Sequence, residues 1–205
     1  MIRVGIGGWT YAPWRGEFYP KGLKYAEELR YAGRHLTSIE INATFYRLQK
    51  PESFQRWAAE TPDDFVFSVK APRVTTHRRA LADAAASIER FLGSGIAELG
   101  PKLGPILWQF PPYKPFREDE FAAFLDFLPK QWQSQPLRHA IEARHESFAA
   151  PALLALLRSR RIARVFVDAE KHPAVADPTA DFIYARLERT EQKQKTGYAP
   201  AALDR

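Results

Sequence analysis

Seven short runs rich in β-branched and aromatic residues recur along the chain, and stretches of helical character separate most of them. Strands that alternate with helices favour a parallel sheet with the helices packed over it, which is the α/β architecture. The glycine cluster Gly5-Ile6-Gly7-Gly8 runs into Trp9 instead of opening a helix, so a barrel is favoured over a dinucleotide-binding sheet. We expect strands at 2–7, 37–42, 65–70, 105–110, 137–143, 162–168 and 181–187, and helices near 22–34, 51–60, 80–98, 117–128 and 150–160.

The 205 residues suit one well-buried domain, and no repeat, linker or low-complexity stretch divides them. We therefore expect residues 1–205 to form a single TIM-like (β/α)-barrel domain. The absence of cysteine excludes disulfides, thiolate nucleophiles and cysteine-based metal sites, and it fits a cytoplasmic protein. No apolar run reaches the about 18 residues of a membrane span. The formal net charge of +6 favours anionic partners.

Polar side chains occupy one parity of the expected strands, near the carboxyl ends. In the strand at 37–42, Ile39 and Ile41 share one face and should contact the covering helices. Glu40 and Asn42 then point into the barrel mouth, where proteins of this architecture place their active sites. The same parity brings further side chains to the mouth: Ser68, Lys70, Gln109, Glu142, Arg144, Asp168, Tyr184 and Arg186.

Two of these carboxylates, Glu40 and Glu142, are the predicted catalytic pair, because carboxylates in different environments can divide the acid and base roles. Glycoside hydrolysis also uses two carboxylates, although the strands between them disfavour the retaining geometry. His77, on the loop after the third strand, is the third predicted catalytic residue, with a helix-capping or solvent-exposed histidine as the alternative. A network of buried ion pairs, such as Glu40 with Lys70 or Glu142 with Arg186, is the purely structural alternative.

The predicted substrate-binding residues combine cations, amides and aromatic rings. Lys70 is either a desolvated Schiff-base amine or a clamp for an anion, and an ion pair with Glu40 favours the clamp. Arg144 and Arg186 suit a carboxylate or phosphate group, with pairing to neighbouring carboxylates as the alternative. The full predicted set is Trp9, Tyr11, Trp14, Asn42, Tyr46, Lys70, Gln109, Arg144, Asp168 and Arg186.

Several motifs follow one another from residue 5 to about residue 186. They read Gly7-Gly8-Trp9-x-Tyr11-x-x-Trp14-x-Gly16-x-Phe18-Tyr19-Pro20, Ile39-Glu40-Ile41-Asn42-x-Thr44-Phe45-Tyr46, Phe67-Ser68-Val69-Lys70-Ala71-Pro72, Thr76-His77, Lys102-Leu103-Gly104-Pro105, Gln109-x-Pro111-Pro112 and Glu142-x-Arg144-His145. Together they resemble the YecE-like family, catalogued as domain of unknown function 72. The resemblance implies a TIM-like barrel, and it supplies no established substrate, cofactor or catalytic residue.

The chain departs from that family at its C-terminal end. Members commonly carry His-Gly after the seventh strand, where this chain has Glu188-Arg189, and they continue for several dozen residues that supply a last helix and strand. We therefore expect seven visible strands, a missing last strand, and unpaired backbone edges on the first and seventh strands. Residues 188–205 are expected to cover the gap poorly or to be mobile, unless a neighbouring chain covers it.

The predicted function is acid/base chemistry, of the hydrolase, isomerase or lyase type, on a small polar anionic molecule in the mouth. The alternative is a non-catalytic binding protein for a metabolite or for single-stranded nucleic acid, whose bases would stack on tryptophan and tyrosine. No cofactor is predicted. A divalent metal stays an open alternative, because glutamate, aspartate and histidine are suitable ligands but no HxH or HExxH spacing supports a site. The sequence does not assign an oligomeric state.

Overall fold

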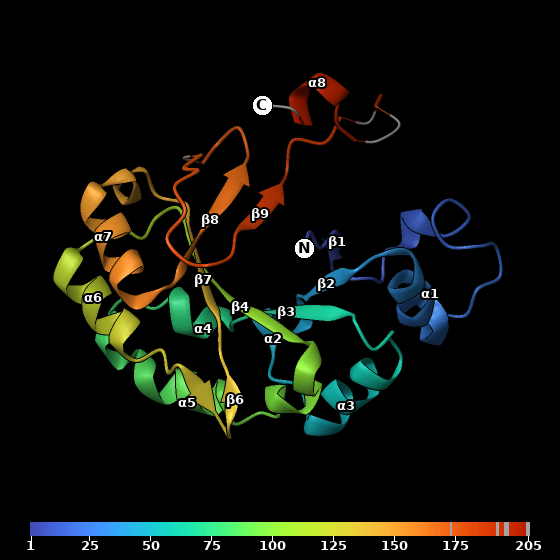
Figure 1. The fold of residues 1–205 in the computed structure, drawn as a ribbon, viewed down its shortest axis with the longest axis horizontal. Helices are drawn as coiled ribbons and strands as arrows, with labels where there is room; N and C mark the ends of the chain where they lie inside the picture. The colour runs from blue at the N-terminus through green and yellow to red at the C-terminus, as the bar shows by residue number, and fades with distance from the viewer. Residues whose placement is uncertain (173, 192, 195–196, 204–205) are drawn as a thin grey trace.

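A curled, seven-stranded parallel sheet forms the frame of the molecule in the computed structural model, which describes residues 1–172, 174–191, 193–194 and 197–203 (Figure 1). The strand order is β1-β2-β3-β4-β7-β8-β9. The strands are Gly5–Gly7 (β1), Ser38–Ile41 (β2), Val66–Lys70 (β3), Leu103–Phe110 (β4), His139–Ala143 (β7), Ala163–Asp168 (β8) and Tyr184–Leu187 (β9). All seven predicted strands are thus confirmed, with the first and the last beginning later than predicted.

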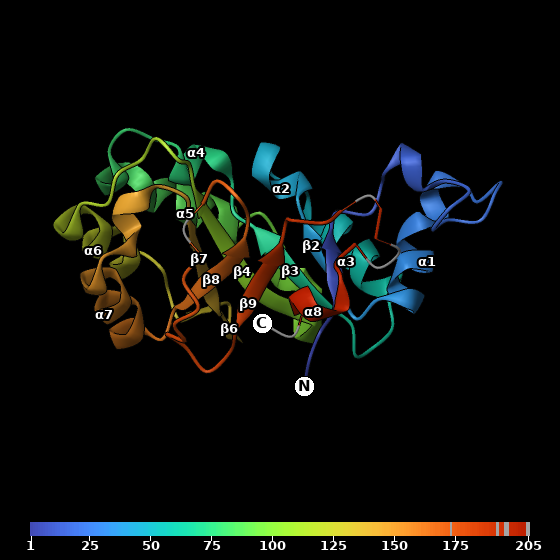
Figure 2. The same ribbon diagram turned by 90° about the horizontal axis from the view of Figure 1, so that it is seen from above.

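Helices line the convex side of this sheet (Figures 1 and 2). Proline opens α3 and α7, where its missing N–H costs no hydrogen bond. No helix in the described ranges has the length and apolarity needed to cross a membrane. The α-helices are Glu28–His35 (α1), Ala43–Tyr46 (α2), Pro51–Ala59 (α3), Arg73–Thr76 (α4), Ala85–Leu92 (α5), Glu118–Asp126 (α6), Pro151–Arg160 (α7) and Pro200–Leu203 (α8), with 3-10 turns at Ala12–Trp14, Tyr25–Glu27, Leu81–Ala84, Ile96–Lys102 and Glu146–Ala149.

A small antiparallel hairpin between α6 and β7 was not predicted. Its strands, Gln131–Trp132 (β5) and Gln135–Pro136 (β6), are two residues long, which is too short for an alternating pattern to be recognised. The turn residues Gln133 and Ser134 have positive φ angles of 47° and 65° without glycine, so the usual hairpin signal is absent from the sequence.

The main core lies between the sheet and the helices. Ile39 and Ile41 are 1% and 0% exposed and pack with apolar residues of α1, α3 and α5, as the parity of β2 predicts. A second, smaller cluster lies on the concave side of the sheet, where Leu107 of β4 and Ala140 of β7 contact the valines of β8. The concave side is therefore apolar along part of its length, and polar side chains gather at the carboxyl ends of the strands.

Within the described residues the sheet is open, so the TIM-like barrel that was predicted, with its last strand missing, is observed only as a curled half-barrel. β1 pairs only with β2, and β9 pairs only with β8, which confirms that both have unpaired edges. The outer face of β9 is uncovered, since Ile183 is 74% and Leu187 49% exposed. The architecture is a half-barrel. The expectation that residues 188–205 are mobile falls partly on 192, 195–196 and 204–205, which lie outside the described residues.

Candidate functional site

The carboxyl ends of five strands bring six of the predicted site residues to one concave end of the half-barrel. Parallel strands place paired residues on the same face, and Glu40 pairs with Ser68 in the β2–β3 register. Gln109 pairs with Glu142 in the β4–β7 register. The six residues that the structure gathers are Glu40, Lys70, Gln109, Glu142, Arg144 and Arg186.

Arg186 holds Glu40 across the concave side of the sheet. Its Nη1 donates to both carboxylate oxygens of Glu40, each at 2.8 Å. The hydroxyl of Tyr184 also donates to Glu40 Oε2, at 2.6 Å, and lies 2.9 Å from Ser68 Oγ. Burial opposes the charge of Arg186, but the carboxylates of Glu40 and Glu142 outweigh it and raise the pKa of Arg186. Burial and Glu40 together raise the pKa of Tyr184 well above its usual value.

Glu142 is fully buried, and its two carboxylate oxygens differ in their hydrogen bonds. Oε1 accepts hydrogen bonds from Gln109 Nε2 at 2.8 Å and from Arg144 Nε at 2.6 Å. Oε2 accepts no hydrogen bond within the described part of the chain, although Arg186 Nε lies 3.4 Å away. The Glu142–Arg186 pair of the structural alternative is therefore present. One carboxylate oxygen keeps an acceptor site unused.

Lys70 does not form the predicted ion pair with Glu40. Arg186 and Tyr184 already engage that carboxylate, and the Lys70 ammonium has no ion pair or hydrogen bond with any described residue. It lies 4.3 Å over the ring of Phe45, whose helix α2 is fixed by a 2.7 Å hydrogen bond from Thr44 Oγ1 to the Lys70 carbonyl. Burial is the main cause that lowers the pKa of Lys70.

His77 lies beside Lys70, at the end of α4. Its backbone N–H donates to the Arg73 carbonyl at 2.8 Å, so the residue ends the helix as the structural alternative proposed. The imidazole ring packs edge-on against Phe45 and Tyr113, at 5.5 and 6.2 Å between centroids. Burial first, and then the positive charges of Arg73 and Lys70, lower the pKa of His77.

Three further predicted residues lie at the edge of this cluster. Tyr11 donates a hydrogen bond to the Gly7 carbonyl, and burial followed by Glu40 raises its pKa. Asn42 lies close to β1, so that a Cβ on Gly7 would be 2.9 Å from its Nδ2 and would require the Asn42 side chain to move. Tyr46 is 74% exposed.

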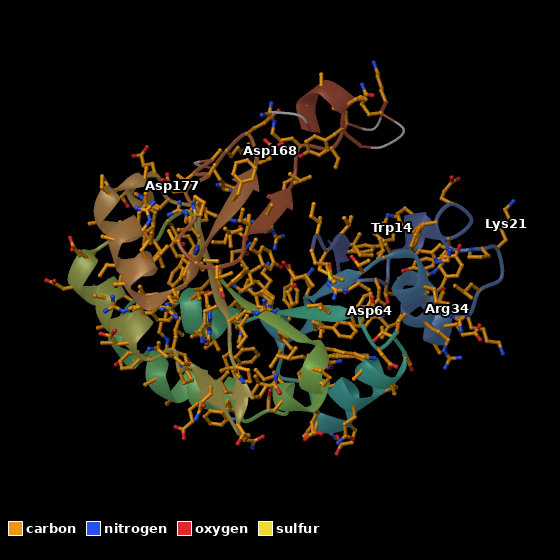
Figure 3. All side chains as sticks on the ribbon, in the orientation of Figure 1. Trp14, Lys21, Arg34, Asp64, Asp168 and Asp177 are labelled. Carbon is orange, nitrogen blue, oxygen red and sulfur yellow. The ribbon has the colours of Figure 1, made fainter. Side chains whose placement is uncertain are left out.

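Trp9 and Trp14 do not reach the cluster. Trp9 packs edge-on against Trp57 at 5.4 Å between centroids, and Trp14 packs against Tyr11, Phe18 and Tyr19. Figure 3 shows Trp14 in the N-terminal loop region beside α1. Both tryptophans support the loop that carries Tyr11 instead of lining the mouth.

The predicted orientation of Asp168 is wrong. Register pairs Val165 with Tyr184 and Val167 with Arg186, so the valines share the concave face with the site. Asp168 has the opposite parity and lies 3.5 Å from Arg189 Nη1, at the end of β8 (Figure 3). The parity was misassigned because the apolar residues of β8 pack inward on the concave apolar cluster.

Glu188 takes the place that was predicted for Asp168. Its Oε1 lies 3.1 Å from Arg186 Nε and 3.4 Å from Arg144 Nη2. It was not among the predicted site residues, although it continues the parity of Tyr184 and Arg186 by two positions. A hollow of about 380 Å³ lies beside it, lined by Ala169, Glu170, Lys171, His172, Glu188, Arg189, Thr190 and Glu191.

Metal ligands do not cluster at this end of the half-barrel. Among the residues with described positions, no group of three or more histidine or acidic side chains could hold an ion. The divalent-metal alternative therefore has no such set of protein ligands in that part of the chain.

Comparison with known proteins extends the motif resemblance. The family model of Protein of unknown function DUF72 matches residues 3–205. The chain is 32% identical over 174 residues to the UPF0759 protein YecE of Escherichia coli (strain K12), covering 82% of this chain and 59% of YecE. It is 29% identical over 157 residues to the UPF0759 protein YunF of Bacillus subtilis (strain 168), covering 74% of this chain and 53% of YunF. The chain thus spans little more than half the length of these curated relatives.

Solved structures share the fold. A DUF72 family protein from Thermotoga maritima superposes with a TM-score of 0.74 at 27% identity, covering 100% of this chain and 84% of that chain. One from Enterococcus faecalis superposes with a TM-score of 0.71 at 21% identity, covering 88% and 67%. With the family model matched over almost the whole sequence, the chain belongs to the DUF72 family of proteins of unknown function.

Proposed function

We propose that the mouth of the half-barrel binds a small polar anion and carries out acid/base chemistry on it, of the hydrolase, isomerase or lyase type. Arg144, Arg186 and Lys70 hold the anion, and Glu142 exchanges a proton with it through Oε2. The single observation that carries the proposal is the grouping of these three cations around a buried carboxylate with an unused acceptor oxygen. Guanidinium groups suit carboxylate and phosphate because they donate two parallel hydrogen bonds.

The anion takes the position that Glu188 occupies. Of the three carboxylates near the arginines, Glu40 and Glu142 are buried, whereas the Glu188 side chain is 31% exposed at the rim. Its contacts of 3.1 and 3.4 Å are longer than the 2.6–2.8 Å bonds that hold the other two carboxylates. A side chain held this loosely can rotate away and leave two guanidinium groups facing the solvent. Lys70, which forms no ion pair with a carboxylate of the described residues, then adds a third donor.

Millimolar phosphate or citrate is expected to raise the melting temperature of the protein, since a ligand of the folded state stabilises it by mass action. Arg144→Met should weaken the binding of either anion about 10- to 150-fold, the equivalent of one charged hydrogen bond. Affinity is measured by isothermal titration and each melting shift against the variant's own baseline. Arg158→Met is the matched control, because it removes the same charge from a surface pair with Asp177.

A protein that ignores every anion tried, or an Arg144→Met variant that binds as well as the Arg158→Met control, would show that the cations are structural. Tight binding of an oligothymidylate that falls steeply with added salt would instead favour the single-stranded nucleic acid alternative. Affinity for citrate alone, with no oligonucleotide binding, supports a small-molecule site.

Glu188→Gln is expected to bind phosphate and citrate about two- to five-fold more tightly than the wild type, because exposed ion pairs contribute up to about 1 kcal/mol. The substitution removes the carboxylate that competes for Arg144 and Arg186 and preserves its shape. Glu17→Gln, an exposed glutamate in the N-terminal loop, makes the same change in net charge and should leave affinity unaltered. Equal affinities of the two variants would place the anion elsewhere.

A further inference from the structure

We propose that Lys70 is a nucleophilic amine, which condenses with the carbonyl carbon of an anionic aldehyde or ketone held in the mouth. The inference rests on the proposed function for the position of the anion, and it adds the substrate class. It assigns to Lys70 a chemical role beyond that of an anion clamp.

The lack of any acceptor around Lys70 is unusual within this molecule. Three lysines are buried in the described residues, each 8–9% exposed: Lys70, Lys102 and Lys114. Lys102 donates to the carbonyls of Ala58 and Thr61 at 2.6 and 2.7 Å, and Lys114 donates to the Arg79 carbonyl and to Glu120. Protein oxygens satisfy the ammonium groups of Lys102 and Lys114. Among the described residues Lys70 Nζ has no such oxygen and is not one of the fully buried unpaired atoms, so it reaches the solvent of the mouth. Of these three lysines, Lys70 alone lacks a protein acceptor among the described residues, and it alone lies in the candidate site.

The surroundings of Lys70 lower its pKa and so make the ammonium easier to deprotonate. Burial is the largest cause that lowers its pKa, and the positive charges of Arg186 and Arg144 act in the same direction. Glu40 and Glu142 act against them, but Glu40 is engaged by Arg186. The ring of Phe45, 4.3 Å from Nζ, restricts where the amine can lie. A neutral, positioned amine is the form of lysine that attacks carbonyl groups.

The chemistry balances without an oxidant or reductant. The Nζ lone pair forms a bond to the carbonyl carbon as the C=O π bond breaks. The nitrogen then gives up one proton and the oxygen takes up one, which gives a neutral carbinolamine. Loss of that hydroxyl as water, with one further proton from an acid, leaves the protonated imine. Glu142 Oε2 and the ring of His77, whose pKa is lowered, are groups near Lys70 that can accept and return these protons. The imine withdraws electrons from the adjacent carbon, so this inference favours a lyase or isomerase over a hydrolase.

The test uses glyoxylate, a small aldehyde that carries a carboxylate, together with sodium cyanoborohydride, which reduces an imine to a stable secondary amine. Intact mass followed by peptide mapping is expected to show one adduct, on Lys70. Labelling should be at least about tenfold faster than at the exposed Lys21, the factor that one charged hydrogen bond to the carboxylate supplies. Lys102 and Lys114 serve as internal controls for burial alone.

Lys70→Arg tests the primary amine itself, because a guanidinium does not form the imine and the variant should therefore lose the adduct. The anion site is tested separately, by the stabilisation of the wild-type protein with citrate. A wild-type protein that citrate stabilises, but whose glyoxylate label spreads over exposed lysines and spares Lys70, would overturn the inference and leave the anion site standing. Labelling of Lys70 without any effect of citrate would support the amine and refute the anion site. If Lys70→Arg does not fold, the wild-type peptide map alone decides.

Discussion

Replacing Arg186 with methionine is expected to lower the free energy of unfolding by about 3–5 kcal/mol, the usual cost of removing one partner from a buried ion pair. Arg186 holds the 7% exposed Glu40 through both carboxylate oxygens and lies 3.4 Å from the fully buried Glu142. Methionine fills much of the volume but leaves both carboxylates with less positive charge around them. The loss therefore measures uncompensated charge more than lost packing.

A double-mutant cycle in urea measures this effect. Glu40→Gln removes the charge that Arg186 compensates, so the double variant Glu40→Gln/Arg186→Met should recover more than half of the stability that Arg186→Met loses. Arg160→Met is the control, because its partner Asp126 is 62% exposed and such surface pairs contribute at most about 1 kcal/mol. If Arg186→Met and Arg160→Met lose equal stability, the ion pairs of Arg186 do not stabilise the fold more than a surface ion pair does.

Acidification from pH 6.5 to pH 4 is expected to cost the protein roughly 3 kcal/mol through His139 alone. Burial lowers the pKa of His139 to about 4 from the ordinary value of 6.5. The unfolded chain therefore binds a proton first as the pH falls. The stabilising contribution is complete above about pH 6.5, declines through this window and is lost once the pH falls through about 4.

The hydrogen bonds of His139 require the neutral ring. Trp108 Nε1 donates to Nδ1 at 3.1 Å, so Nε2 carries the proton and donates to the Pro129 carbonyl at 2.8 Å. Urea unfolding between pH 4 and 7.5 measures the effect. His139→Gln should reduce the number of protons taken up on unfolding in this pH range by about one, and so reduce the slope of the unfolding free energy against pH. His35→Gln, at an exposed histidine, is the control for the substitution itself. A slope that survives in His139→Gln would assign the acid sensitivity to other groups.

The sequence correctly predicts which face of a strand packs on the helices where every second residue of the strand is apolar and the residues between them are polar. In β2 the isoleucines alternate with Ser38 and Glu40, and the apolar face packs on the helices as expected. In β8 the same reasoning misplaced Asp168, because the valines of that strand face the concave side. Alternation shows that neighbouring residues point in opposite directions. It does not say which face turns inward when the concave side is itself apolar.

The ion-pair partner of Glu40 could not be predicted from the sequence either. Lys70 lies on the neighbouring strand and was the natural partner by strand order. The actual partner, Arg186, is 146 residues further along the chain and reaches Glu40 across the concave side. That approach depends on how strongly the sheet curls, which is a property of its packing and not of any local pattern. The unpaired edges of β1 and β9 were predicted from the missing last strand, whereas the degree to which the sheet curls was not.

The long separation between Glu40 and Arg186 also bears on when the mouth forms during folding. Contacts between residues far apart in sequence carry the entropy of closing a long loop, so they tend to form after local ones. Strands β1 to β4 pair with neighbours that are near in sequence. The hydrogen bonds from Tyr184 and Arg186 to Glu40 instead require β9 to be in place. The contacts that Tyr184 and Arg186 make with Glu40 therefore form only after β9 has paired with β8, which makes the charge network at the mouth a late event in folding.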